Sequence, residues 1–441
     1  MAGLRRSDRT WRALRLATAA GLLLVFLWAG ISIWARLDPS RDIALPTEED
    51  YNPFMDDYAV YWTAGRMVLD GNAGQLYDLD KVQSYQARAT GQPSYDVALL
   101  PYFNPPFAAG ALSGLAVLPL GVSAVVFTGL SLAALGSGLR ILLSRLNTRL
   151  EVVAWTLGVL SSMPLYYTLL HGQFSFLLFF LFVAVYVLLK RGSDGLAGAT
   201  LALLLLKPPL VLLPLLVLAL NRRMEALRGF LTCATGLVIA SVVIGGPSSL
   251  IAYPELLATA TTWDDEAGIL IRAMFGWNAF FEALTGPTGF LIPMLLAGAA
   301  SIGTLLLCLR AWKGPPWDAQ SPDFDVRFSM LVLGVLLTSP HLYGQDLIIG
   351  VIPAALLYGA FRSNRDRLVI VALVLAIWAI MHVHVELLDA TGLNFVTLLI
   401  LSIFLVARAR LRDAGLGAQD KMRAGLPASG RPSLPERAAA R

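Results

Sequence analysis

Long apolar segments separated by short polar junctions run through most of the chain. The first, Leu16–Ala35, contains no charged residue and, at about 20 residues, is long enough to cross a hydrocarbon core of roughly 30 Å. Further predominantly apolar segments follow at residues 152–169, 174–189, 195–206, 208–220, 229–246, 289–309, 327–340, 347–361, 368–385 and 393–407. This pattern predicts an all-α, polytopic transmembrane helical bundle with about 11–13 spans.

Two regions depart from the regular alternation of spans and junctions. Residues 104–143 form two apolar segments, although the alternation of sides leaves room for one net crossing. Either the first segment, Pro105–Val117, is a re-entrant or interfacial helix, or one basic cluster is external. Its length of about 13 residues is too short to span, which favours the first explanation. The junction Leu206-Lys207-Pro208-Pro209 also divides two short segments, and we predict that it lies partway into the membrane, covered by protein or a water-filled cavity.

The charged residues indicate the orientation of these spans. Only 15% of the residues are charged, against about 25% in a typical soluble domain, and the mean hydropathy is +0.66. Basic residues lie at the ends of apolar segments, so the positive-inside rule predicts cytoplasmic termini and a first external loop at residues 37–103. We expect a plasma-membrane location. Because the basic clusters do not form one face of a soluble domain, the pI near 9.1 does not indicate a nucleic-acid partner.

The chain is predicted to be one membrane domain over residues 1–412, followed by a polar, disordered cytoplasmic tail over 413–441. The first apolar run is too long for a cleaved signal peptide and lacks the small-residue cleavage site. Cys233 and Cys308 fall in apolar segments and therefore indicate neither a disulfide nor a metal cluster. The sequence contains no nucleotide-binding or hydrolase motif of the common types, so group transfer on the external face requires a lipid-borne activated donor.

A pair of carboxylates, Asp56 and Asp57, follows the first span. Beyond it, Tyr58, Tyr61, Ala64 and Val68 recur at helical spacing, and Gly71 stands where the helix should end. We predict an amphipathic helix on the outer membrane face. Two interpretations of the pair remain open: it holds a general base that deprotonates a hydroxyl beside a lipid, or one aspartate caps the helix.

Lys207 and the residues of two external junctions are further candidates for chemistry. An ammonium between apolar helices costs about 2.5–3.5 kcal/mol on the insertion scale, and such residues are functional by default. No carboxylate is near Lys207 in sequence, so we expect a lipid phosphate as its partner, unless it snorkels to an interface. His171 with Gln173, and His341 with Asp346, suit a phosphate or sugar hydroxyls, although a lone loop histidine is more often an ordinary surface group.

The external loop at residues 246–289 places acids beside tryptophan in Trp263-Asp264-Asp265-Glu266, with Arg272 following. Acids and aromatic rings suit a carbohydrate, although tryptophan is equally common at membrane interfaces. We expect Asp264 and Arg272 to contribute to substrate binding. The acids of the chain are scattered in sequence, so we expect no metal and no other cofactor.

The motifs occur in a recognisable order. They are Asp57-Tyr-Ala-Val-Tyr61, Ala64-Gly-Arg66, Gly71, Leu76-Tyr-Asp78, Tyr102-Phe-Asn-Pro-Pro-Phe107, Gly172-Gln173, Gly198, Leu206-Lys-Pro208 and Ser339-Pro-His341 with Asp346. In these motifs the chain resembles glycosyltransferase family 87, integral membrane enzymes of the GT-C fold that use polyprenol-phosphate sugars. The resemblance covers about residues 15–410.

The resemblance implies inverting transfer of mannose or a related sugar from a polyprenyl-phosphate donor to a hydroxyl of a lipid or glycan on the external face. Asp57 matches the family's catalytic acid and would be the general base. Cations would offset the charge of the donor phosphate, so no metal is needed. The expected substrate-binding residues are Asp56, Arg66, His171, Gln173, Lys207, Asp264, Arg272, His341 and Asp346.

Two other classes of protein fit the same sequence. A transporter or flippase of lipid-linked saccharides would carry its functional charges near the bilayer midplane, where Lys207 is the candidate. A non-catalytic membrane subunit of envelope assembly would use Asp56 or Asp57 only as a cap. Membrane lipids are the other expected partners, and the sequence leaves the sugar, the acceptor and the oligomeric state open.

Overall fold

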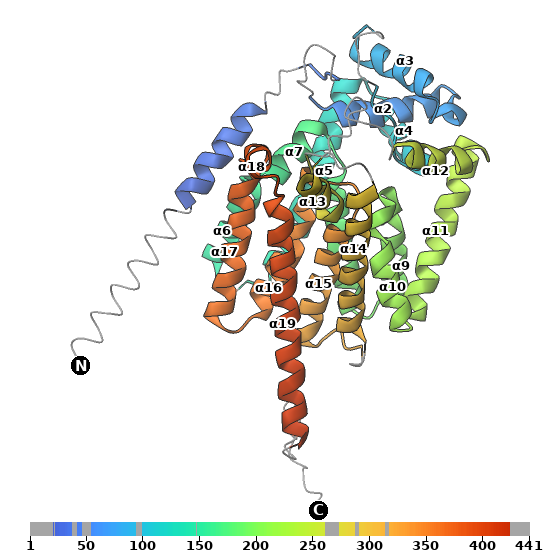
Figure 1. The fold of residues 1–441 in the computed structure, drawn as a ribbon. Coiled ribbons are helices and arrows are strands. Elements are labelled where there is room, and N and C mark those ends of the chain that lie inside the picture. The colour runs from blue at the N-terminus through green and yellow to red at the C-terminus, as the bar shows by residue number, and fades with distance from the viewer. Residues whose placement is uncertain are drawn as a thin grey trace, which may run out of the picture.

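The computed structural model describes residues 21, 23–37, 42–45, 54–93, 99–146, 148–260, 273–286, 291–313 and 317–423 (Figure 1). Most of these residues are helical. Strand β1 (Met274–Phe275) pairs with β2 (Leu342–Tyr343) in one short antiparallel ladder, and Ala44 and Phe54 form an isolated antiparallel bridge. The predicted all-α, polytopic membrane bundle is confirmed.

The long helices of the bundle run between two opposite ends of the molecule, and shorter helices complete it (Figure 1). Its helices are α5 (Leu120–Leu143), α6 (Arg149–Leu160), α7 (Met163–His171), α8 (Ser175–Lys190), α9 (Asp194–Leu203), α10 (Leu212–Leu220), α11 (Met224–Gly245), α13 (Gly276–Thr285), α14 (Leu291–Trp312), α15 (Pro322–Thr338), α16 (Val351–Ala360), α17 (Asn364–Met381), α18 (His384–Thr391) and α19 (Phe395–Arg423). The 3-10 helices η2 (Leu204–Leu206), η3 (Pro208–Leu210) and η6 (Gly344–Gly350) interrupt them.

A layer of shorter helices covers one end of the bundle, and α19 leaves the opposite end (Figure 1). The layer contains α2 (Asp56–Leu69), η1 (Ala73–Gln75), α3 (Leu79–Thr90), α4 (Pro106–Ala116) and α12 (Ser249–Ala260). Its helix α4 matches the short helix predicted at Pro105–Val117, and Trp62 of α2 donates a hydrogen bond to the carbonyl of Leu118 just beyond α4. We call this end the covered end.

The predicted spans differ in length and continuity. By length and composition, the helices α5, α11 and α14 can each cross a membrane, and the count of described spans reaches 5 if two bent pairs are included. These pairs are α6 with α7, bent by 48°, and α17 with α18, bent by 85°. The remaining apolar helices are shorter, with 10–17 residues. The break at Lys207 separates two of them, where the sequence predicted a junction.

The boundary predicted at Arg412 does not end the last helix. Helix α19 continues to Arg423, whereas we expected a disordered tail from residue 413. Residues 408–423 are polar but consist mainly of alanine, arginine, leucine and other good helix formers, and polarity alone does not prevent a helix from extending into water.

Close approach of α9 and α11 depends on glycine. A Cβ atom on Gly198 of α9 would lie 1.8 Å from the carbonyl oxygen of Ala226, and one on Gly229 of α11 would lie 2.0 Å from that of Gly195. Both clashes are with backbone, which cannot move aside as a side chain can. These glycines therefore let the two helices pack backbone against backbone.

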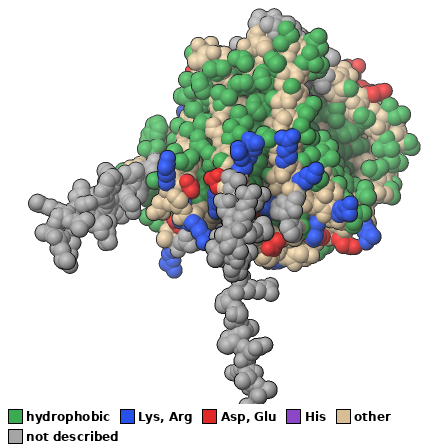
Figure 2. Space-filling view, turned by 60° about the horizontal axis from the view of Figure 1, so that its bottom comes forward, with side chains coloured by type: hydrophobic (Ala, Val, Ile, Leu, Met, Phe, Trp, Pro, Cys, Tyr) green, Lys and Arg blue, Asp and Glu red, His purple; other side chains and the backbone are tan. Residues whose placement is uncertain are grey.

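Lys and Arg side chains gather at the end from which α19 emerges (Figure 2). Acidic side chains at this end are fewer in the same view. The concentration of basic residues opposite the covered end agrees with the charge pattern on which the predicted orientation rests.

Candidate active site

The carboxylates Asp56 and Asp57 lie in the first turn of α2, and neither caps the helix. The N-cap residue is Met55, in the left-handed region at φ 54°, and no side chain caps this end. The Met55 N–H donates to the carbonyl of Leu170 at 2.6 Å, which fixes the start of α2 against the end of α7. The interpretation that one aspartate of the pair caps the helix is therefore wrong.

The turn between α7 and α8 supplies the partners of both carboxylates. It consists of His171, Gly172 and Gln173, with Gly172 at φ 69°. A Cβ atom on Gly172 would lie 2.5 Å from the Cβ of Tyr58, so both the backbone conformation and the close contact with α2 require glycine here. The glycine thus brings the two flanking side chains under the start of α2.

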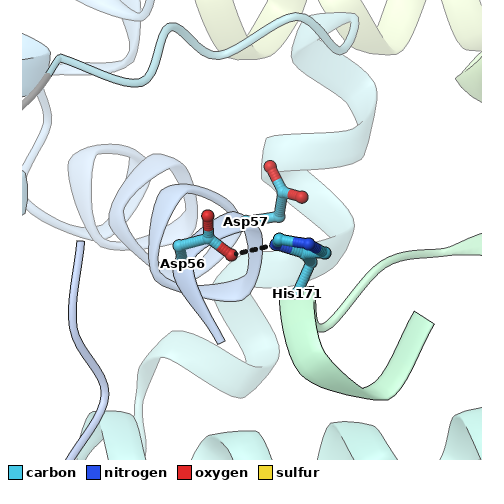
Figure 3. Close-up of side chains that lie close together, drawn as sticks. All are labelled: Asp56, Asp57 and His171. Atoms are coloured by element: carbon cyan, nitrogen blue, oxygen red, sulfur yellow. Dashed lines mark hydrogen bonds and ion pairs between the residues drawn. The ribbon is translucent and has the colours of Figure 1, made fainter. Parts of the chain in front are cut away.

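Asp56 is buried and paired with His171. Its carboxylate lies 2.8 Å from the Nδ1 atom of the imidazole (Figure 3), and the residue is 4% exposed. Asp56 is thus the buried member of the pair, and His171 satisfies its charge.

Asp57 is partly accessible and is held by an amide. Gln173 donates from Nε2 to the carboxylate of Asp57 at 2.5 Å, and its own oxygen accepts a hydrogen bond from the hydroxyl of Tyr61 at 2.8 Å. The phenol fixes the orientation of the amide, so the amide nitrogen must point at Asp57. This arrangement leaves carboxylate lone pairs of Asp57 open to a further proton donor.

The surroundings of Asp57 favour the protonated, neutral form of its carboxyl group more than water does. Burial and the charge of Asp56 raise the pKa of Asp57 from 3.8 to about 7. His171, Gln173 and Lys207 act in the opposite direction, by attraction or hydrogen bonding. A carboxyl group whose pKa lies near neutrality is well matched to accept a proton from a substrate hydroxyl.

Lys207 lies at the break between η2 and η3 and is paired with the buried carboxylate of Asp346. No carboxylate lies near Lys207 in sequence, and Asp346 comes from the distant helix η6. A lipid phosphate as a further partner of Lys207 stays a prediction. Asp346 also accepts hydrogen bonds from the hydroxyl of Ser175 at 3.2 Å and from the N–H of Tyr343 at 3.1 Å. Asp346 therefore anchors the ammonium of Lys207, which keeps further N–H donors for a ligand.

The two halves of the cluster share one region of the covered end. Lys207 acts electrostatically on Asp57, and both Asp57 and Asp346 act on Tyr61, whose pKa is raised chiefly by burial. His341 belongs to the same region, because burial and then the charge of Lys207 lower its pKa below 6.5. Neutral His341 can donate a hydrogen bond beside a charged ammonium.

The structure separates some expected site residues from this cluster. Arg66 stands nine positions beyond Asp57 on α2, about 13 Å along the helix, and pairs at 2.9 Å with Asp70 on its exposed side. Asp264 and Arg272 lie outside the described residues. The cluster therefore brings together Asp56, Asp57, His171, Gln173, Lys207, His341 and Asp346.

Other residues support the site in ways that the sequence motifs hinted at only in part. Asn104 donates from Nδ2 to the carbonyl of Leu206 at 3.1 Å, and so satisfies the broken backbone beside Lys207. Tyr77 in turn donates to the carbonyl of Asn104 at 2.9 Å. Asn104, Tyr77 and Tyr61 belong to the quoted motifs without an assigned role. Ser175, by contrast, carries no sequence signal, since serine near a helix start is common.

Asp56, Asp57 and His171 are also close enough together to hold a metal ion. One ligand atom from each lies within 4.8 Å of the others, and two carboxylate oxygens with one imidazole nitrogen are an acceptable ligand set for zinc or another divalent ion. Asp56 and Asp57 thus cluster with His171 in space, although the acids of the chain are scattered in sequence. Binding an ion here would replace the hydrogen bond between His171 and Asp56. The absence of a metal stays a prediction.

Comparison with protein-family models assigns the chain to a family. The model of glycosyltransferase family 87 matches residues 102–340, more than half of the chain. The matched part includes His171, Gln173 and Lys207, whereas Asp57 precedes it. No curated protein and no solved structure matches the chain.

Proposed function

We propose, from the premise that this chain belongs to glycosyltransferase family 87 and is a membrane glycosyltransferase, that it moves a sugar from a polyprenyl-phosphate donor to a hydroxyl group. The observation that carries the proposal is that two functional groups share one region of the covered end. One is the partly accessible carboxylate of Asp57, which Gln173 orients. The other is the ammonium of Lys207, which the buried carboxylate of Asp346 holds in place.

Asp57 is the general base. Its carboxylate accepts the proton of the acceptor hydroxyl while the hydroxyl oxygen forms a bond to the anomeric carbon of the sugar. The bond from that carbon to the phosphate oxygen breaks at the same time, and polyprenyl phosphate leaves with the electron pair. Attack from the face opposite the leaving group inverts the anomeric configuration.

Lys207 and His341 receive the donor phosphate. Negative charge builds up on the phosphate oxygens as the bond breaks, and N–H donors placed before the reaction stabilise that charge. Asp346 fixes Lys207 from behind, so the ammonium needs no reorganisation during the step. This division leaves Asp57 to act on the acceptor alone.

The donor sugar is mannose or a related sugar, and the acceptor is a lipid or a glycan. In this proposal the covered end faces the outside of the plasma membrane, and the gathering of basic residues at the other end supports that orientation. A lipid-borne donor suits this placement, since its tail remains in the bilayer while the phosphate meets the site at the surface.

The test is a transfer assay with the purified full-length protein in lipid nanodiscs. Polyprenyl-phosphate mannose and polyprenyl-phosphate arabinose are offered separately with a membrane lipid extract as acceptor, and a nucleotide sugar serves as the control donor. We expect release of polyprenyl phosphate with one lipid-linked sugar, a product of inverted configuration, and no use of the nucleotide sugar. Use of the nucleotide sugar, or a retained configuration, contradicts the proposal.

A further inference from the structure

The ladder of β1 and β2 adjoins His341, which receives the donor phosphate in the proposed function. Leu342, the residue after His341, pairs with Phe275 of β1 in this ladder. Because neighbouring residues of a strand move together, the position of His341 depends on where β1 lies.

The turn from β1 into α13 also packs against the residues that lead to His341. Gly276 begins α13 at φ 84°, a conformation that favours glycine. A Cβ atom on Gly276 would lie 3.1 Å from the carbonyl oxygens of Leu336 and Leu337, and 3.3 Å from that of Ser339. Ser339 stands two positions before His341 in the chain. The turn and its strand therefore contact the chain on both sides of His341.

Two buried side chains at the start of α19 hold this turn. The hydroxyl of Thr397 accepts a hydrogen bond from the N–H of Gly276 at 3.0 Å. Asn394 donates from Nδ2 to the carbonyl of Met274 at 2.9 Å. The Thr397 hydroxyl in turn donates to Oδ1 of Asn394 at 3.1 Å, and both residues are at most 1% exposed. The backbone on either side of β1 is thus fixed by a helix that carries none of the site residues.

Capping of α19 uses only the oxygen of Asn394. That oxygen accepts a hydrogen bond from the N–H of Thr397 at 3.2 Å, as an N-cap residue does. Aspartate or serine caps a helix about as well as asparagine, but neither carries an amide N–H for the carbonyl of Met274. The contact with β1 is therefore separate from the stability of the helix start.

We propose that Asn394 and Thr397 are positioning residues for the donor phosphate, acting on His341 through β1 and β2. The inference rests on the proposed function, since it takes His341 as a phosphate contact. Loss of either side chain leaves a backbone group of the turn without its partner, so the turn shifts and His341 shifts with it. The ion pair of Lys207 with Asp346 does not involve the turn and stays in place. The phosphate then loses one of its two donors.

Binding of polyprenyl phosphate to the full-length protein in lipid nanodiscs tests the proposal. Polyprenol of the same length, which lacks the phosphate, is the second probe, and the ratio of the two Kd values reports the phosphate contacts alone. We expect the wild-type protein to prefer the phosphate. Thr397→Val and Asn394→Ser should each lower this preference about tenfold, as expected for one lost hydrogen bond to a charged group. Thr397→Ser keeps the hydroxyl and should retain most of the preference.

A matched variant separates positioning from general stability. Thr304 is a buried threonine of α14, and its hydroxyl accepts a hydrogen bond from Trp277 of α13. Thr304→Val should lower the unfolding temperature about as much as Thr397→Val does and keep the wild-type preference for the phosphate. An equal loss of preference in Thr304→Val would assign the effect to stability and overturn the positioning role.

A double variant tests whether the effect passes through His341. His341→Ala should lower the phosphate preference about tenfold, and adding Thr397→Val should lower it no further, because residues that act through one contact are not additive. If Thr397→Val does not fold, Asn394→Ser takes its place. Additive losses, or wild-type preference in both Thr397→Val and Asn394→Ser, overturn the positioning role. A wild-type protein without preference for the phosphate overturns the proposed function itself.

Discussion

The hydrogen bond from Gln173 to Asp57 leads to a quantitative prediction. Gln173→Ala removes a donor that stabilises the ionised carboxylate from 2.5 Å. A hydrogen bond to a charged group is worth ~1.5–3 kcal/mol, and one pKa unit corresponds to ~1.4 kcal/mol. Because Asp57 is partly accessible, water will replace some of the loss, and we expect the pKa of Asp57 to rise from about 7 by ~1 unit.

The sign of the effect follows from the role of Asp57 as a base. The base acts only when ionised, so kcat/KM rises with pH through its pKa. The wild-type protein should lose activity as the pH falls through about 7, and Gln173→Ala should lose it at a pH ~1 unit higher. At pH 7 the variant is then several-fold slower than the wild-type protein, and its activity recovers near pH 9.

The assay is the pH profile of kcat/KM for the acceptor, with saturating donor. Gln75→Ala, an exposed glutamine in η1 on the same end of the molecule, is the matched control and should keep the wild-type profile. Tyr61→Phe, which frees the amide of Gln173 to rotate, should move the profile in the same direction by less. A uniform loss of rate in Gln173→Ala at every pH would refute the reasoning.

Further predictions concern the donor, the metal and helix packing. Lys207→Ala should raise the KM for the donor about 10–100-fold and leave that for the acceptor unchanged in initial-rate measurements; equal changes in both would argue against a phosphate contact. Activity should survive prolonged dialysis against EDTA in the transfer assay, and loss restored by a divalent ion would assign Asp56, Asp57 and His171 to a metal. Gly198→Ala should lower the unfolding temperature by several degrees in a fluorescence melt, since forced overpacking costs ~1–3 kcal/mol. Gly236→Ala, whose added Cβ meets open space, should leave the unfolding temperature unchanged. Equal unfolding temperatures of the two variants would show that α9 and α11 can move apart without cost.

The fold class could be predicted from the sequence because a membrane span is a local property. Twenty apolar residues suffice to recognise one, whatever lies elsewhere in the chain. The count of spans was less predictable. Whether a short apolar helix such as α4 crosses the membrane or lies on the end of the bundle depends on helices that are distant in sequence.

The site residues were predictable one by one, but their partners were not. The sequence indicated Asp57 because it opens a helical pattern beyond the first span and matches a family motif, and Lys207 because an ammonium between apolar helices is conspicuous. It could not show that Lys207 pairs with Asp346, or that Asp56 pairs with His171, because these contacts join segments more than one hundred positions apart. Arg66 shows the opposite case, because it belongs to a quoted motif and yet lies away from the cluster, paired with Asp70.

The most direct test of the central claim is the transfer rate of Asp57→Asn. The substitution keeps the size of the side chain and removes its ability to accept a proton, and Asp80→Asn, an exposed acid in the first turn of α3, provides the matched control. We expect a loss of at least ~100-fold, the usual contribution of a general base, with full activity in the control. Transfer by Asp57→Asn at the wild-type rate would contradict the assignment of Asp57 as the base.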